Sequence, residues 1–126
     1  MKKYIPKTKD DIKAIYELEK KNIFEIKPDV KILLEWIQDM HWDVSMGIMN
    51  YFKKNINEID NEIIEILDSN DEEWKYNILF FLVKDSKPEN FSKDLKQIIK
   101  RIAFNPNPTE IEEGLNVLAQ NIIKSF

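Results

Sequence analysis

The stretch EWIQDMHWDV, from Glu35 to Val44, concentrates the side chains of this sequence that could do chemistry. It holds two of the three tryptophans, the single histidine His41, and two carboxylates, Asp39 and Asp43. A histidine beside a carboxylate can act as a general acid or base, but catalysis also needs a partner such as a nucleophile within reach. The chain has no Gly-x-Ser-x-Gly motif, and residues two apart on a helix do not face each other. We therefore interpret His41 as a turn or surface residue and predict no catalytic residue.

A second group of carboxylates, Asp71 to Glu73, precedes Trp74. Calcium-binding loops need a central glycine and a fixed ligand spacing, and both are absent here. Acidic residues in a helix's first turn stabilise its positive end, which explains Asp43, Glu72 and Glu73 without a ligand. We expect no metal ion and no cofactor. The alternative is a carboxylate- and metal-dependent enzyme, in which this group would converge with Asp39 and Asp43.

Length and composition restrict the protein class. The 126 residues fit one domain, residues 1–126, and include only two glycines, five prolines and no cysteine. With two distant glycines no phosphate-binding loop can form. The net charge of −4 disfavours a nucleic-acid partner, because such proteins use a basic face to neutralise phosphates; binding through a lysine patch is the weakest alternative. No apolar run has the length of a signal peptide or a membrane span, so we predict a cytoplasmic protein without membrane attachment.

Apolar spacing and start signals predict an all-α protein of about seven helices. The first begins with Thr8 as its expected N-cap. Ser69 with Glu72, or Asn70 with Glu73, has capping-box spacing for the fifth. Thr109 and Glu112 show the same spacing before the last helix. The expected segments are about 8–20, 28–40, 43–54, 57–67, one that starts within 69–74 and continues through ILFFLV, 92–104, and one that follows Thr109.

A repeat relates two of the expected helical hairpins. Leu33–Gln38 (LLEWIQ) aligns with Ile63–Asp68 (IIEILD) at an offset of 30 residues, and Trp36 falls on Ile66, which indicates a core position. Stacked hairpins cover each other's apolar faces, and this is the physical basis of α-solenoids. We therefore predict a short HEAT-like α-solenoid of three hairpins plus an N-terminal capping helix, with a closed helical bundle as the alternative. Further apolar pairs recur at the same offset: Val44 and Trp74, Ile48 and Ile78, Met49 and Leu79, Tyr51 and Phe81, and Phe52 and Leu82.

Trp42 and Trp74 lie near the starts of the second helices of two hairpins. Such helices often line a binding face, and tryptophan is enriched among the residues that dominate binding energy. Packing between repeats is the other explanation for both tryptophans. We name six residues as a partner surface: Asp39, His41, Trp42, Glu72, Glu73 and Trp74.

Several segments resemble the DUF5071 family, an uncharacterised and mainly bacterial family. LLEWIQDMHWDVS is similar to its LLEWLQDMNWPVA-like segment, and NDEEWKY, the NPT step in NPNPTEIEE and the opening IPKTKDD also match. His41 stands where asparagine is common, and Asp43 where proline is common. The resemblance covers nearly the whole chain and implies a HEAT-like helical fold, but it implies no activity.

Together these features predict a non-catalytic module that binds another protein. A specific version is an immunity-type or regulatory protein in a bacterium that masks a basic partner. Acidic complementarity would mainly speed such an association.

Overall fold

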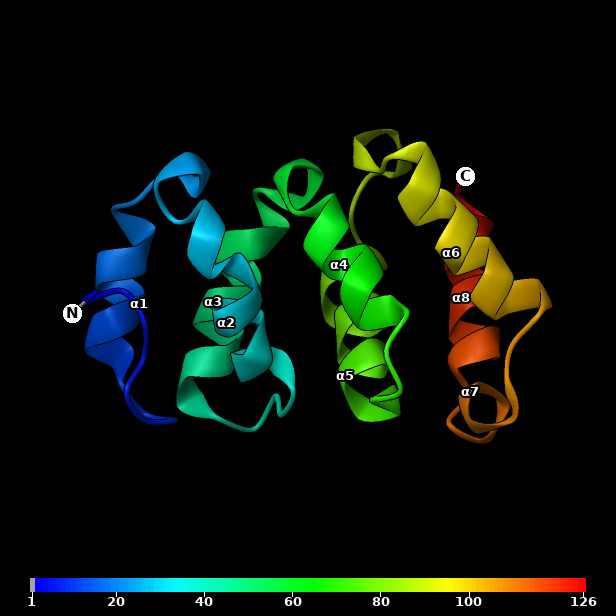
Figure 1. Cartoon of the computed structure of the whole chain (residues 1–126), viewed down its shortest axis with the longest axis horizontal. Helices are drawn as coiled ribbons and strands as arrows, with labels where there is room; N and C mark the ends of the chain where they lie inside the picture. Colours follow the sequence, from blue (N-terminus) through cyan, green and yellow to red (C-terminus); the bar gives the residue numbers. More distant parts are fainter. Residues whose placement is uncertain (1) are drawn as a thin grey trace.

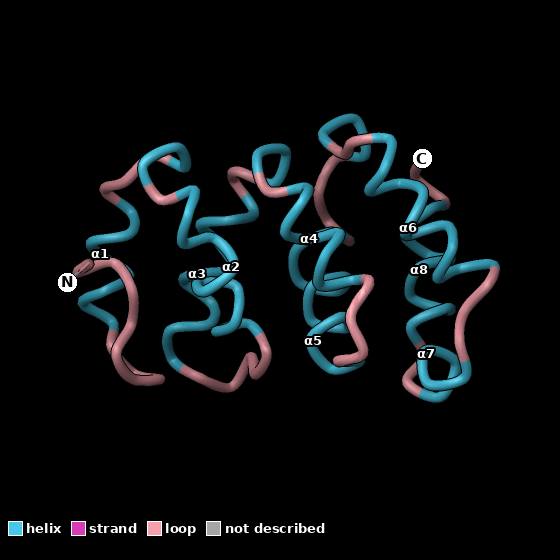
Figure 2. Tube along the Cα trace, in the orientation of Figure 1, coloured by secondary structure: helices cyan, strands magenta, loops and turns pink. Residues whose placement is uncertain are grey.

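The computed structural model describes residues 2–126, which form helices and loops without a β-strand (Figures 1 and 2). Within these residues no helix is both long and apolar enough to cross a membrane. The α-helices are α1 (Ile12–Glu19), α2 (Val30–Leu34), α3 (Asp43–Lys53), α4 (Asp60–Leu67), α5 (Glu72–Asn77), α6 (Lys93–Phe104), α7 (Pro108–Glu112) and α8 (Leu115–Ile123). The shorter elements are the 3-10 turns η1 (Ile23–Glu25), η2 (Lys27–Asp29), η3 (Glu35–Ile37), η4 (Ile56–Glu58) and η6 (Pro88–Asn90), and the π-helical η5 (Ile78–Val83).

Groups of helices follow one another along the long axis of the molecule in chain order: α1, then α2 with α3, then α4 with α5, and finally α6 with α7 and α8 (Figure 1). α1 packs against α3, and α3 packs against η5, which continues α5. α4 packs against α6, and α8 packs against both α5 and α6. The chain ends therefore lie at opposite ends of the array, with the N-terminus beside α1 and the C-terminus beside α6 and α8 (Figure 1).

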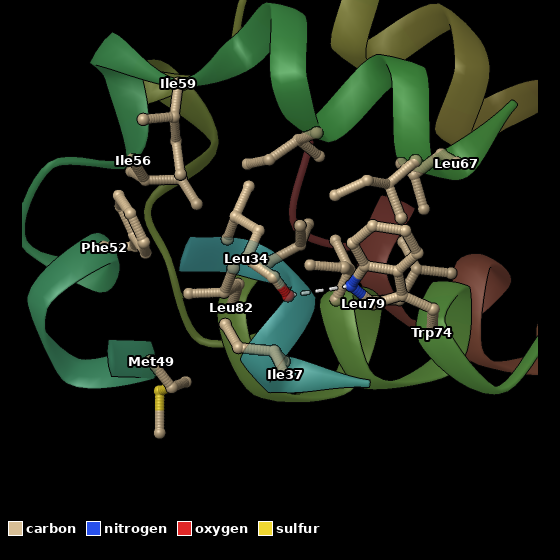
Figure 3. Packing of buried hydrophobic residues seen from close by; sticks show 14 of the residues in the cluster. Leu34, Ile37, Met49, Phe52, Ile56, Ile59, Leu67, Trp74, Leu79 and Leu82 are labelled. Atoms are coloured by element: carbon tan, nitrogen blue, oxygen red, sulfur yellow. Dashed lines mark hydrogen bonds between the residues drawn. The ribbon is translucent and has the colours of Figure 1, made fainter. Parts of the chain in front are cut away.

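One apolar core runs through the array (Figure 3). Several apolar pairs at the 30-residue offset are buried in both copies, for example Leu33 with Ile63 and Phe52 with Leu82, whereas Phe81, the counterpart of Tyr51, is half-buried. Trp36 is half-buried and packs against this core. The ILFFLV run is helical, as predicted. Its form is π-helical, a rare geometry that occurs mostly as a short insertion within an α-helix.

The predicted N-caps of the first and fifth helices are wrong. α1 begins at Ile12 rather than near Thr8, whose Oγ1 donates to Asp10 (2.7 Å) in the preceding turn. α5 begins after Asp71, whose side chain accepts a hydrogen bond from the Trp74 N–H (3.1 Å). The Ser69 hydroxyl donates to the Ile66 carbonyl at the end of α4 and accepts from the N–H of Asp71, the residue before α5, so its hydrogen bonds lie outside the helix.

The last predicted helix is two helices. Asn107, not Thr109, caps α7, and its capping-box partner is Glu110. Pro108 explains this shift, because a proline suits the first helical position and so places the cap one residue before it. α7 ends at Glu112, and Gly114, just before α8, has a left-handed φ of 73° that glycine readily adopts. α8 consequently leaves α7 at a new angle and can lie along α6.

A buried ionic network fixes α7 against α5 and α6. The Lys75 side chain is 1% exposed and donates to Glu110 Oε2 (2.7 Å), Glu72 Oε1 (3.0 Å) and the Ser69 carbonyl (3.0 Å). Glu110 is fully buried and also accepts from the Arg101 guanidinium at both oxygens. Burial favours the neutral acid, but hydrogen bonds from Arg101, Lys75 and the backbone N–H of Asn107 outweigh it and lower the pKa of Glu110 to about 2.

The N-terminal segment is anchored to the start of α2. Buried Asp29 accepts hydrogen bonds from the Tyr4 hydroxyl and from Lys2 Nζ (2.7 Å). Burial, reinforced by the bond to Asp29, raises the pKa of Tyr4 to about 12. These contacts hold the next residues, Ile5 and Pro6, beside α2 and η3.

We predict that Glu110 makes the free energy of unfolding depend on pH in the acidic range. Its folded pKa of about 2 lies below its ordinary value of 4.5, so its stabilisation is present above about pH 4.5 and is lost as pH falls towards 2. The shift corresponds to about 3 kcal/mol. Glu110→Gln should cost about 3–5 kcal/mol at neutral pH, because buried Lys75 loses its partner.

Urea unfolding from pH 7 to pH 2 measures this effect. The Glu110→Gln variant should lose less of its free energy of unfolding on acidification than the wild type does. Glu112→Gln, two residues along the same helix and exposed, is the matched control and should behave like the wild type. Parallel pH curves for Glu110→Gln and wild type would contradict the role assigned to Glu110.

We also predict that Gly47 on α3 is required by the close approach of α1. A Cβ at Gly47 would lie 2.6 Å from Cγ2 of Ile15. Gly47→Ala should therefore destabilise by about 1–3 kcal/mol through overpacking, even though alanine is the better helix former. In a double-mutant cycle, Ile15→Ala should cost less on the Gly47→Ala background than alone. Additive costs in thermal or urea unfolding would show that the two positions do not clash.

Candidate functional site

The turn between η3 and α3 presents Asp39, His41 and Trp42. Asp39 Oδ1 accepts a hydrogen bond from the His41 backbone N–H (2.8 Å) and lies 3.0 Å from His41 Nδ1. The backbone bond, followed by the contact with the ring, lowers the pKa of Asp39. The His41 side chain is 98% exposed, and the Ser45 hydroxyl donates to the Asp39 carbonyl (2.7 Å). These bonds form the corner between two helices and leave the imidazole in solvent.

The carboxylates named in the metal-dependent alternative have separate local roles. Asp71 caps α5, and Glu72 pairs with Lys75. Asp43 lies in the first turn of α3. Between residues 2 and 126, no three His, Asp or Glu side chains gather in a way that could hold a metal ion.

An apolar hollow lies beside the turn, with Trp36 and Trp42 in its wall. The two rings meet edge to face, with centroids 5.5 Å apart and planes at 72°. Ile32 contributes exposed apolar surface, and Glu35 is a charged residue in the lining. The hollow has a volume of about 290 Å³. Its lining is completed by Ile5, Pro6 and Gln38.

Trp74 does not belong to an exposed surface. It is 8% exposed, and its indole N–H donates to the Leu34 carbonyl (3.0 Å), as the dashed line in Figure 3 shows. This bond joins α5 to α2 across the array. Trp42, in contrast, is half-buried and lines the apolar hollow. The two tryptophans therefore have different roles, and Trp74 packs between the helices.

A second hollow contains Glu72 and Glu73 together with residues that sequence reasoning missed. Its lining also includes Tyr76, Asn77 and Glu113, and its volume is about 470 Å³. Glu113 lies 40 residues beyond Glu73 and joins it only because the ionic network holds α7 against α5. No spacing in the sequence indicates this meeting. We call this the acidic hollow.

Asn77 links the acidic hollow to the apolar hollow. Its Nδ2 donates to the carbonyls of Ile37 (2.9 Å) and Gln38 (3.1 Å), and Gln38 lines the apolar hollow. The turn after η3, the start of α5 and α7 also share one edge of the molecule, the lower edge in Figure 1. Five of the six predicted surface residues thus lie along one edge, and the sixth, Trp74, is beneath it.

Comparison with known proteins identifies the family but no function. A family model described as "Domain of unknown function (DUF5071)" matches residues 4–123. No curated protein matches the chain. The match confirms the resemblance based on the tryptophan-rich segment and the NDEEWKY motif.

We predict that the two tryptophans contribute unequally to stability. Trp74→Phe removes the indole donor and leaves the Leu34 carbonyl without its partner, so it should lower the free energy of unfolding by about 1–3 kcal/mol. Trp42→Phe retains an aromatic ring in a half-buried position and should cost under about 1 kcal/mol. Urea unfolding of the two variants tests this, and equal losses would contradict the assignment.

Proposed function

The chain belongs to the DUF5071 family, and from its surface we propose that it is a non-catalytic module that binds another protein. The observation that carries this proposal is the pair of adjacent hollows, one apolar and tryptophan-walled and one acidic, on one edge of the array. A half-buried aromatic pair beside polar groups is the composition typical of protein interfaces.

We propose further that the array is a short HEAT-like α-solenoid of three hairpins capped by α1. Support comes from the paired buried positions at the 30-residue offset and from packing between elements that are near in sequence. In such an array each hairpin covers its neighbours, and the edges remain available for partners.

The partner we propose is a basic protein. The net charge is −4, and the turn between Gln38 and Asp43 and the α7 segment after Asn105 contribute acidic side chains without a lysine. Opposite charge increases the rate of association and discriminates against acidic proteins. In a bacterial cytoplasm this arrangement suits an immunity-type or regulatory protein that masks a basic partner.

We predict that Trp42 is needed for partner binding. The full chain, immobilised and exposed to a lysate of its source organism, should retain a basic protein. Trp42→Ala should weaken retention by tenfold or more, because a central aromatic anchor contributes about 2 kcal/mol or more. Retention is measured by quantitative mass spectrometry of the eluate.

Phe24→Ala is the matched control. Phe24 is 68% exposed and lies in η1, on the opposite edge of the array in Figure 1. Its replacement should leave retention unchanged. If the wild-type chain retains no protein, or if Trp42→Ala retains the partner as fully as Phe24→Ala does, the proposed surface is wrong.

A further inference from the structure

The acidic hollow has an excess of negative charge that the protein does not neutralise itself. Glu72 is paired with Lys75, and the Lys75 protons are all committed to Ser69, Glu72 and Glu110. Glu73 and Glu113 are exposed and form no salt bridge with any residue from 2 to 126. Two carboxylates with free oxygens therefore line the hollow, and no basic side chain lines it.

Asn77 adds an unused acceptor to the same hollow. The residue is 8% exposed, and its amide nitrogen is held by the carbonyls of Ile37 and Gln38. Its Oδ1 accepts no hydrogen bond from the described part of the chain. This oxygen is accessible to solvent rather than buried, so a ligand in the hollow that carries N–H groups can donate to it in place of water.

Tyr76 supplies a rigid aromatic wall. Its ring is 38% exposed and stacks on Phe80, with centroids 5.7 Å apart and planes at 9°. Phe80 is itself held by Lys84, whose Nζ lies 4.5 Å from the ring centre. An aromatic face next to carboxylates favours a flat cation, because such a cation can stack on the ring while donating hydrogen bonds at its edge.

We propose that the acidic hollow is a binding site for an arginine side chain of the partner protein. The guanidinium would stack on Tyr76, donate to Glu73 and Glu113, and satisfy Oδ1 of Asn77. Arginine fits better than lysine because its planar group provides five donors in a fixed geometry, whereas an ammonium is a compact point charge. This inference rests on the proposed function, and it names the chemistry that the basic partner must present.

The test uses the full 15N-labelled chain and three pentapeptides, acetyl-Gly-Ser-X-Ser-Gly-amide, in which X is arginine, lysine or citrulline. The arginine peptide should shift the amide signals of residues 72–77 and 113, the lysine peptide should bind more weakly, and neutral citrulline should produce no shift. Tyr76→Leu should weaken arginine binding about two- to fivefold through loss of the ring.

The decisive variant is Glu73→Gln/Glu113→Gln, which should weaken arginine-peptide binding about tenfold or more. Its matched control is Glu19→Gln/Glu89→Gln, which removes the same net charge from two exposed positions far from the hollow and should change binding less than about twofold. Equal weakening by the two pairs, or equal shifts from citrulline, would overturn the site. Unchanged melting temperatures show that the variants remain folded.

The same variant separates this inference from the proposed function. If the lysate partner is retained equally by wild type and by Glu73→Gln/Glu113→Gln, the arginine site is wrong and the interaction module stands. If the arginine peptide binds as described but wild type retains no protein, the proposed function is wrong and the arginine site stands.

Discussion

The burial of Lys75 is the constraint on which the C-terminal half of the structure depends. A lysine that is 1% exposed can remain charged only if its three protons find acceptors and its charge finds partners. The Ser69 carbonyl, Glu72 and Glu110 meet this requirement. The positive charge of Arg101 pairs with Glu110, so that two cations face two carboxylates. The end of α4, the first turn of α5 and the short helix α7 are therefore held at one point.

That point also determines the surface. Because Glu110 must reach Lys75, α7 is held beside the first turn of α5, and Glu113 follows three residues later. On the opposite side of α5, Asn77 and Trp74 hold the α2–η3 segment in place, since each donates to a backbone carbonyl of that segment. Side chains of α5 thus fix its neighbours on both sides, and the hollows are the spaces left along the edge where these neighbours meet.

The sequence predicts regular features of this fold better than single contacts. Helices recur because apolar residues repeat at helical spacing, and the 30-residue offset finds Val44 with Trp74 and Ile48 with Ile78, all buried. The predicted N-caps of the first, fifth and last helices differ from the observed ones because several Ser, Thr, Asn and Asp residues compete within a few positions. Hydrogen bonds to neighbouring turns decide among them. Glu110 pairs with Lys75, 35 residues away, and Glu113 lines a hollow with Glu73, 40 residues away; neither separation follows a periodicity, so nothing local indicates these meetings. Trp42 and Trp74 are predicted together by residue type, and only the three-dimensional packing distinguishes half-buried Trp42 from buried Trp74.

The proposed binding role of the exposed carboxylates rests on a contrast between two sets of carboxylates in this region. Inside, Glu72 and Glu110 are matched with Lys75 and Arg101, because an unpaired charge there would cost several kcal/mol. Outside, Glu73 and Glu113 are unmatched, which costs little in water. The interaction energy of these carboxylates with a cation increases when a partner excludes water, since charge pairs strengthen as the surrounding dielectric falls. A cation that brings its own apolar flank to Tyr76 would meet both conditions, so the arrangement favours a protein side chain over a free ion.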